Sequence, residues 1–288
     1  MGQSTMIYDY QEQKQFYLLD NHFNSHTTSI EWINPSSSAL LVEATRKGAI
    51  YIWRIPSIEK KQQPSIVSSF LAFPAFAKQS QDEKNMNSIV LDWNQTTGQL
   101  AAAGTTQLVK VWDMDQERLL CCKETGYHSP VVSVKSSSEF IYHCCLSNGI
   151  VMAMDTRCKE IVNQYSTSLS SSSSFVNMSV MNNGTLVIGE LDGQVHMIDP
   201  RVLQPMKTVQ LPSLLSSIQA HPILPLIAAT SLKSELSICD LEGNVQQSIR
   251  TCGGFREASL GYLKSVAYHP LDNCIATYNS DGIVYVFN

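Results

Sequence analysis

Charged residues are scarce in this 288-residue chain, where Asp, Glu, Lys and Arg together make up 16%. The 20 basic residues are outnumbered by 25 acidic ones, and the resulting net charge of −5 argues against a nucleic-acid partner. No apolar run approaches the ~18 residues of a membrane-spanning helix, so no membrane insertion is expected. The eight cysteines contain no C-x-x-C pair, which suits a reducing, cytoplasmic location.

Motifs of catalysis and cofactor binding are also missing. The chain has no G-x-S-x-G, no H-E-x-x-H, no phosphate-binding loop and no dinucleotide fingerprint. His143, Cys144 and Cys145 are consecutive in a strand-like run, and neighbours on a strand point to opposite faces, so they should not share a metal ion. We therefore predict a protein that is not an enzyme, with no catalytic, cofactor-binding or metal-binding residues, no cofactor and no small-molecule substrate.

Two other pairs of residues have structural interpretations. His22 and His26 have helical spacing, but they lie in an Asn-rich, turn-like stretch that predicts an exposed loop. Lys60 and Lys61 could contact an acidic partner, but their Pro-interrupted surroundings predict a solvated loop.

A repeated segment organises the chain. Short β-branched or aromatic stretches each end in a large residue, and these are spaced by 45, 59, 42, 44, 41 and 48 residues. All but one of these spacings lie near the ~40–45 residues of a four-stranded propeller blade. The large residues are Tyr8, Trp53, Trp112, Met154, Ile198, Cys239 and Phe287.

All of these stretches except the first follow two upstream strands, an apolar one and, before it, an alternating one. Tight turns containing Gly48, Gly149, Gly193 or Gly282 precede four of the stretches, and Asn-Gly and Asp-Gly are strong hairpin signals. A four-stranded blade cannot bury both faces alone, so it stacks on its neighbours. The pattern predicts an all-β, WD-type β-propeller that occupies residues 1–288 as a single domain.

Trp112-Asp113 is the only full signature pair of the WD repeat. Asp155, Asp199 and Asp240 occupy the Asp position in other repeats. The repeat resembles the WD family, in which the Trp packs between blades and the Asp helps to fix a tight turn. The resemblance implies that these aspartates and the large residues that precede them are structural repeat positions. A carboxylate pair of Asp113 with Asp115 is the alternative interpretation.

The two ends of the chain leave the number of blades open. Residues 1–20 supply a partial first blade, with strands Ser4–Tyr8 and Gln15–Leu19, and Ile283–Phe287 is the last strand. The 25 expected strands are three fewer than seven complete blades contain. Either Gln15–Leu19 completes the last blade of a closed six-blade ring, or the chain is a seven-blade design with one incomplete blade.

Two stretches interrupt the repeat. Residues 57–87 are polar and Pro-interrupted and read as an inter-blade insertion loop, within which Ile66–Phe70 could be an outer strand. Ser170–Ser174 is an unbroken run of serine that predicts a disordered loop or a phosphorylation segment.

Aromatic residues crowd the first 23 positions, where burial in the propeller is the first expectation and an exposed binding patch the second. They are Tyr8, Tyr10, Phe16, Tyr17 and Phe23.

Several short strings recur in a collinear order over nearly the whole chain: Met6–Tyr10, Val90–Gly98, Val109–Glu117, Ile198–Arg201, Leu215–Pro222, Gly253–Phe255 and Ala267–Pro270. Together they resemble the C-terminal WD-repeat propeller of the raptor family, the regulatory subunits of TOR complex 1. The resemblance implies a fragment of a longer scaffold subunit, a seven-blade design and protein partners in a TOR kinase complex.

Two alternative functions remain open. One is a WD-repeat scaffold of another protein assembly. The other is a propeller hydrolase or lyase, which would need titratable groups to converge from several innermost strands. Those strands carry Glu31, Asp92, His221 and His269 near their ends.

Overall fold

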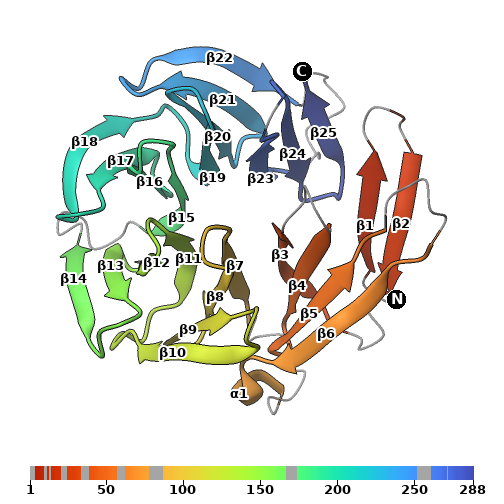
Figure 1. The fold of residues 1–288 in the computed structure, drawn as a ribbon. Helices are drawn as coiled ribbons and strands as arrows, with labels where there is room; N and C mark the ends of the chain where they lie inside the picture. The colour runs from red at the N-terminus through yellow and green to blue at the C-terminus, as the bar shows by residue number, and fades with distance from the viewer. Residues whose placement is uncertain are drawn as a thin grey trace. The chain divides into compact units, whose positions relative to one another are not determined.

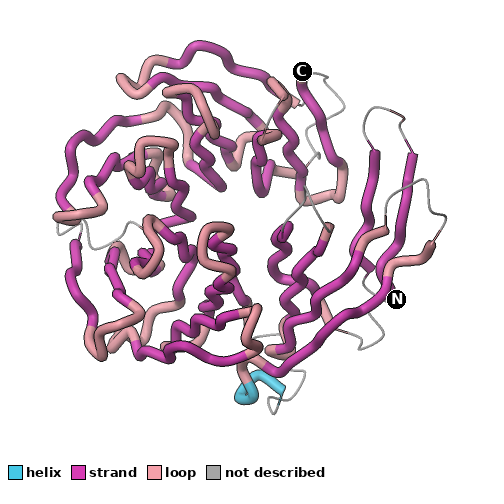
Figure 2. Tube along the Cα trace, in the orientation of Figure 1, coloured by secondary structure: helices cyan, strands magenta, loops and turns pink. Residues whose placement is uncertain are grey.

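The computed structural model describes residues 4–9, 12, 14–20, 25–33, 39–56, 62–77, 87–166, 174–251, 261–270 and 272–288. Strands make up nearly all of its regular structure, with one short helix, α1 (Pro74–Ala77), in the described part of the chain (Figure 2). The all-β prediction is confirmed. No helix in these ranges has the length and apolar character to cross a bilayer. The chain divides into two compact units, Met1–Glu139 and Phe140–Asn288.

The first unit contains a two-stranded sheet and two four-stranded antiparallel sheets, each with its strands side by side in chain order (Figure 1). Its strands are β1 (Ser4–Asp9) and β2 (Lys14–Asp20); β3 (Thr27–Ile33), β4 (Leu40–Thr45), β5 (Ala49–Arg54) and β6 (Ser65–Leu71); β7 (Ile89–Asn94), β8 (Gln99–Gly104), β9 (Leu108–Asp113) and β10 (Arg118–Glu124); and finally β11 (Val131–Ser136).

The second unit repeats the same up-and-down order and ends in a three-stranded sheet. Its strands are β12 (Ile141–Leu146), β13 (Ile150–Asp155) and β14 (Ile161–Ser166); β15 (Phe175–Val180), β16 (Leu186–Glu190), β17 (Gln194–Asp199) and β18 (Gln204–Gln210); β19 (Leu215–Ala220), β20 (Leu226–Ser231), β21 (Glu235–Asp240) and β22 (Val245–Arg250); and β23 (Leu263–Tyr268), β24 (Ile275–Asn279) and β25 (Val284–Phe287).

The 25 strands in the described residues equal the number expected from the repeat. Which of the two closures joins the ends of the chain stays a prediction. Within residues 57–87, β6 is the fourth strand of its sheet and includes the expected outer strand Ile66–Phe70, and α1 follows it. Residues 57–61 and 78–86 of that stretch lie outside the described residues, as do 170–173 of the serine run.

Burial differs between the strands of one sheet. Second strands such as β4, β8 and β16 are buried on both faces, and so is the third strand β13, whereas fourth strands such as β14 alternate between exposed and half-buried residues. This pattern follows from sheets that pack face to face within each unit. Core clusters form between successive sheets, one around Val42, Ile50 and Leu100 and another around Val187, Val195 and Ile218.

The hairpin glycine Gly193 shows why the turns need this residue. Its φ is +100°, a region that L side chains rarely adopt. A Cβ atom there would lie 2.8 Å from the carbonyl oxygens of both Leu211 and Ser213.

Polar side chains join the first strands of successive sheets. The Asn177 side chain on β15 donates from Nδ2 to the Ile218 carbonyl oxygen of β19 at 2.8 Å, and its Oδ1 accepts from the Ile218 N–H at 2.9 Å. The Ser179 hydroxyl accepts from the Ala220 N–H at 3.0 Å. In the first unit, Thr28 Oγ1 on β3 accepts from the Ile89 N–H of β7 at 3.2 Å. These bonds, which we call edge clasps, satisfy peptide groups on the edge of a first strand.

We expect Asn177→Ala to lower the free energy of unfolding by about 1–3 kcal/mol, because the Ile218 peptide group loses both partners in a partly buried site. Urea denaturation measures the change. Asn163→Ala is the matched control, since its side chain donates one exposed bond to the Val202 carbonyl. A control effect as large as that of Asn177→Ala would contradict a special role for the edge clasp.

Candidate functional site

The large residues of the repeat occupy different environments. Trp53, Met154, Ile198 and Cys239 are buried in their sheets. Trp112 is partly buried and its ring lies 5.2 Å from that of Phe70. Phe287 is also partly buried and belongs to the core cluster of the last sheet, whereas Tyr8 is 53% exposed.

The aspartates of the repeat contact the turns that follow them. Asp113 Oδ1 accepts from the Gln116 N–H at 3.0 Å, and Asp199 Oδ1 accepts from the Arg201 N–H at 2.9 Å. Asp155 Oδ1 accepts from the Arg157 N–H at 2.9 Å, and the two side chains form an ion pair at 2.6 Å. These carboxylates are therefore engaged locally.

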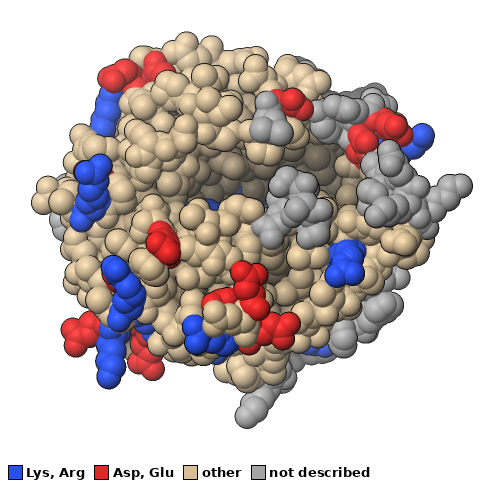
Figure 3. Space-filling view, in the orientation of Figure 1, with Lys and Arg blue, Asp and Glu red and all other residues tan. Residues whose placement is uncertain are grey.

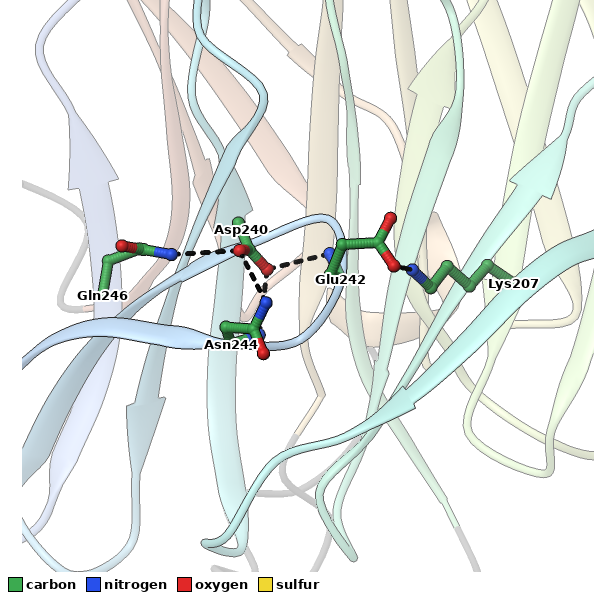
Figure 4. Close-up of polar contacts among 5 residues, drawn as sticks. All are labelled: Lys207, Asp240, Glu242, Asn244 and Gln246. Carbon is green, nitrogen blue, oxygen red and sulfur yellow. Dashed lines mark hydrogen bonds and ion pairs between the residues drawn. The ribbon is translucent and has the colours of Figure 1, made fainter.

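Asp240 has the densest set of such bonds (Figure 4). Its Oδ1 accepts from the Glu242 and Asn244 N–H groups, and its Oδ2 accepts from the Asn244 and Gln246 amides, at 2.9–3.0 Å. The bond from the Asn244 side chain is the main cause that lowers the pKa of Asp240. Lys207 pairs with Glu242 beside this turn, so β18 is linked to the β21–β22 turn.

Two buried polar networks were not foreseen from the sequence. Glu43 on β4 accepts from Trp53 Nε1 at 2.9 Å and from the Thr5 hydroxyl at 3.1 Å, and it also contacts Thr27. This network holds β1 against the β3–β6 sheet. A lone Glu within the apolar strand Leu40–Thr45 was the available signal.

The second network lies in the β15–β18 sheet. His196 Nε2 lies 2.7 Å from Glu190 Oε1, and His196 Nδ1 lies 3.0 Å from the Thr208 hydroxyl. Glu190 and His196 are both buried. Because both ring nitrogens are engaged, this histidine is held by its partners and links β16, β17 and β18.

Titratable groups from three first strands converge in the first unit. Lys135 Nζ on β11 lies 2.8 Å from Asp92 Oδ1 on β7, and Asp92 Oδ2 accepts from the Ser136 N–H at 2.7 Å. Burial raises the pKa of Glu31 on β3, against the attraction of Lys135. Burial by itself would lower the pKa of Lys135. The attraction of the Asp92 and Glu31 carboxylates is stronger than this effect of burial, so the pKa of Lys135 is raised. Sequence reasoning named Glu31 and Asp92 and missed Lys135.

A propeller hydrolase or lyase would require such a convergence of titratable groups. The geometry of this group, however, is that of an edge clasp. Both oxygens of Asp92 have partners, one of them the edge N–H of the next first strand. A raised lysine pKa holds the ammonium form, which cannot act as a general base at neutral pH. The arrangement fits a structural ion pair better than acid–base chemistry.

The histidines at the ends of two first strands also form hydrogen bonds with the turns that follow them. His221 Nδ1 accepts from the Ile223 and Leu224 N–H groups at 3.0 and 2.9 Å, and burial lowers the pKa of His221. His269 Nδ1 accepts from the Asp272 N–H at 2.9 Å. The neutral imidazole that accepts these bonds fixes the chain after each strand.

The remaining sequence candidates are placed as follows. His143, Cys144 and Cys145 are buried; burial lowers the pKa of His143 to about 4 and raises that of Cys145. His26 is exposed. Within the described ranges, no three His, Cys, Asp or Glu residues form a group that could hold a metal ion. His22, Lys60, Lys61, Tyr10, Phe23 and Gly253–Phe255 lie outside the described residues.

The expected burial of the aromatic residues among the first 23 positions is observed only in part. Phe16 and Tyr17 are partly buried, and Tyr17 packs near Leu19 and Trp53, but Tyr8 is exposed. The expectation of burial was wrong for Tyr8, which lies with Ser4 and Met6 on the exposed face of β1.

Exposed apolar side chains gather on the last sheet and its turns. Tyr262, Tyr278, Ile283, Val284 and Val286 are 42–65% exposed. Charged side chains are sparse on the displayed face, which is mostly uncharged (Figure 3).

Known proteins support this description. No protein-family model matches the chain. It is 25% identical over 98% of its length to a raptor homologue of Dictyostelium discoideum, and 22% identical over 98% to the regulatory-associated protein of TOR 1 of Arabidopsis thaliana. A TOR complex 1 subunit of Saccharomyces cerevisiae, KOG1, is 21% identical over 98% of the chain. The resemblance to the raptor family is confirmed. The chain spans about a fifth of the length of these raptor relatives.

Solved structures identify the fold. The crystal structure of Raptor of Chaetomium thermophilum matches this chain with a TM-score of 0.83 at 17% sequence identity. The match covers 99% of this chain and 25% of the Raptor chain. A chain of the mitotic checkpoint complex matches 99% of the chain and 81% of its own with a TM-score of 0.77 at 14% identity. The prediction of a WD-type β-propeller is confirmed.

We expect Asp92→Ala to destabilise the protein by about 3 kcal/mol, because it leaves the Lys135 ammonium and the Ser136 N–H without their carboxylate. Thermal denaturation measures the loss. Asp115→Ala removes an exposed carboxylate and serves as the control. Equal stability of the two variants would exclude the edge clasp at Asp92.

Glu31→Gln should change how stability depends on pH. A raised pKa means that the folded state binds the Glu31 proton more tightly than the unfolded state, whose reference value is 4.5. The contribution of Glu31 to the stability of the parent therefore falls as the pH rises above 4.5, and the neutral Gln lacks this contribution. Unfolding free energies between pH 4 and pH 7 should shift in favour of the variant as the pH rises. A difference between parent and variant that does not depend on pH would contradict the assignment.

Proposed function

We propose that the chain is the WD-repeat part of a raptor-like, non-catalytic subunit that supports TOR kinase signalling in TOR complex 1. The observation that carries this proposal is the similarity to raptor and TOR complex 1 subunits over nearly the whole chain. The protein partners would be those of a TOR kinase complex, in the cytoplasm, with no nucleic acid, membrane insertion or small-molecule substrate.

A scaffold role agrees with the use of the buried polar groups. Glu43, Asp92, Glu190 and His196 each bond to neighbouring strands. We propose that the chain is not an enzyme, that residues 1–20 form a partial first blade of a single propeller, and that the insertion loop lies within 57–87. The proposed structural repeat positions are Tyr8, Trp53, Trp112, Asp113, Met154, Asp155, Ile198, Asp199, Cys239, Asp240 and Phe287.

A scaffold of another assembly is the second candidate. The propeller in the mitotic checkpoint complex has a similar fold, so the fold alone does not select the partner. The sequence relatives favour the TOR complex, because the named relatives are raptor or TOR proteins.

Affinity purification of the tagged protein, expressed from its own gene, tests the proposal. We expect the TOR kinase to be recovered in near-stoichiometric amounts by quantitative mass spectrometry, and an unrelated tagged propeller should recover none. Recovery of a different assembly in comparable amounts, without the kinase, would favour the second candidate.

A further inference from the structure

Two Asn-Gly pairs occur in the chain, Asn148-Gly149 and Asn183-Gly184. The first lies in the turn that joins β12 to β13, and the second in the turn that joins β15 to β16. Both asparagine side chains are exposed. An asparagine followed by glycine can react with its own backbone, because the glycine has no Cβ to obstruct the approach of the two groups. The structure distinguishes the two pairs by what surrounds them.

The two glycines differ in the space around them. A Cβ atom placed on Gly184 would meet no heavy atom within 4 Å. Gly149, in contrast, is buried. Gly48 occupies the equivalent turn between β4 and β5, where a Cβ atom would lie 2.2 Å from the Phe73 carbonyl oxygen. Turns between second and third strands are therefore packed against the chain that follows the fourth strand, whereas the turn at Gly184 is open.

The two asparagine side chains also differ in their hydrogen bonds. The Thr185 N–H donates to Asn183 Oδ1 at 3.0 Å, which folds the side-chain carbonyl back along the next two residues. When a nitrogen atom attacks this carbonyl, its oxygen gains negative charge, and a fixed N–H at hydrogen-bond distance stabilises that charge. Among the residues that the structure describes, none forms a hydrogen bond with the Asn148 side chain.

The attacking nitrogen atoms are both engaged in the folded chain. The Gly184 N–H donates to the Met181 carbonyl oxygen at 2.8 Å, and the Gly149 N–H donates to the Leu146 carbonyl oxygen at 3.2 Å. Each turn must therefore open before its glycine nitrogen can react. An exposed turn opens at a lower free energy than one that is packed against its neighbours. The surroundings of the two turns therefore favour reaction at Asn183.

We propose that Asn183 is a site of spontaneous deamidation, and that the fold protects Asn148 from the same reaction. The Gly184 nitrogen gives its proton to water and forms a bond to Asn183 Cγ. The Cγ–Nδ2 bond then breaks, and the amide nitrogen takes up a proton and leaves as ammonia. Water opens the resulting cyclic imide at the side-chain carbonyl to give aspartate, or at the main-chain carbonyl to give isoaspartate. The reaction consumes one water and releases one ammonia, with no oxidant or reductant.

Both products change the tip of the β15–β16 hairpin. Each adds a negative charge to an exposed turn that has only uncharged side chains between residues 181 and 185. Aspartate keeps a side-chain acceptor for the Thr185 N–H, whereas isoaspartate places an extra carbon in the main chain and disturbs this bond. The inference stands apart from the proposed function, because the reaction needs only this chain and water.

Peptide mapping by mass spectrometry on the purified, folded chain tests the proposal. Samples are kept at neutral pH, and fragmentation that distinguishes aspartate from isoaspartate follows both pairs over time. The chain unfolded in urea supplies the intrinsic rate of each pair, to which the rate in the folded chain is normalised. We expect the normalised rate at Asn183 to exceed that at Asn148 by at least about tenfold, because only the packed turn requires a costly opening.

Gly184→Ala is the matched variant, since the turn has space for the added methyl group. The methyl group obstructs the approach of the nitrogen, so the rate at Asn183 should fall at least about fivefold while that at Asn148 in the same sample stays unchanged. Circular dichroism checks that the variant is folded, and the parent chain alone decides the outcome if it is not. A ratio below tenfold in the folded parent, or no conversion of Asn183 there, would overturn the proposal.

Discussion

The free edge of each first strand is the constraint on which the packing within each unit depends. Its peptide groups have no strand beside them, so they need partners from elsewhere. Side chains on the preceding first strand supply them: Thr28 for Ile89, Asp92 for Ser136 and Asn177 for Ile218. The partners are 61, 44 and 41 residues apart, and the longest separation spans the stretch that contains β6 and α1. The edge clasps therefore follow the repeat and set how one sheet lies against the next.

The same constraint explains why buried polar groups here are poor candidates for catalysis. A catalytic group must offer a free lone pair or proton to a substrate. Asp92 instead gives one oxygen to Lys135 and the other to a backbone N–H, and His196 is held through both ring nitrogens. The lone pairs and protons of these two side chains are bonded to neighbouring groups and are therefore not free to act on a substrate.

Local features of the sequence predicted most of the fold. Alternating apolar residues and Gly-containing turns gave strands such as Ile141–Leu146 at their observed positions. The buried networks were missed because their members come from strands that are far apart in the chain, as Thr5 and Glu43 do. Nothing near Glu43 in sequence indicates that a threonine hydroxyl will reach it. Lys135 escaped notice for the same reason, since only the packing of β7 against β11 brings it to Asp92.

Val284 shows a deeper limit of sequence patterns. Its strand reads like the other third strands, with a β-branched residue at the position that Ile50, Val109, Val151 and Val195 occupy. Periodicity assigns a residue to a face of a sheet, but it does not say whether a further strand covers the edge beside it. Burial at this position depends on the number of strands in the sheet, which is a property of pairing rather than of the residue.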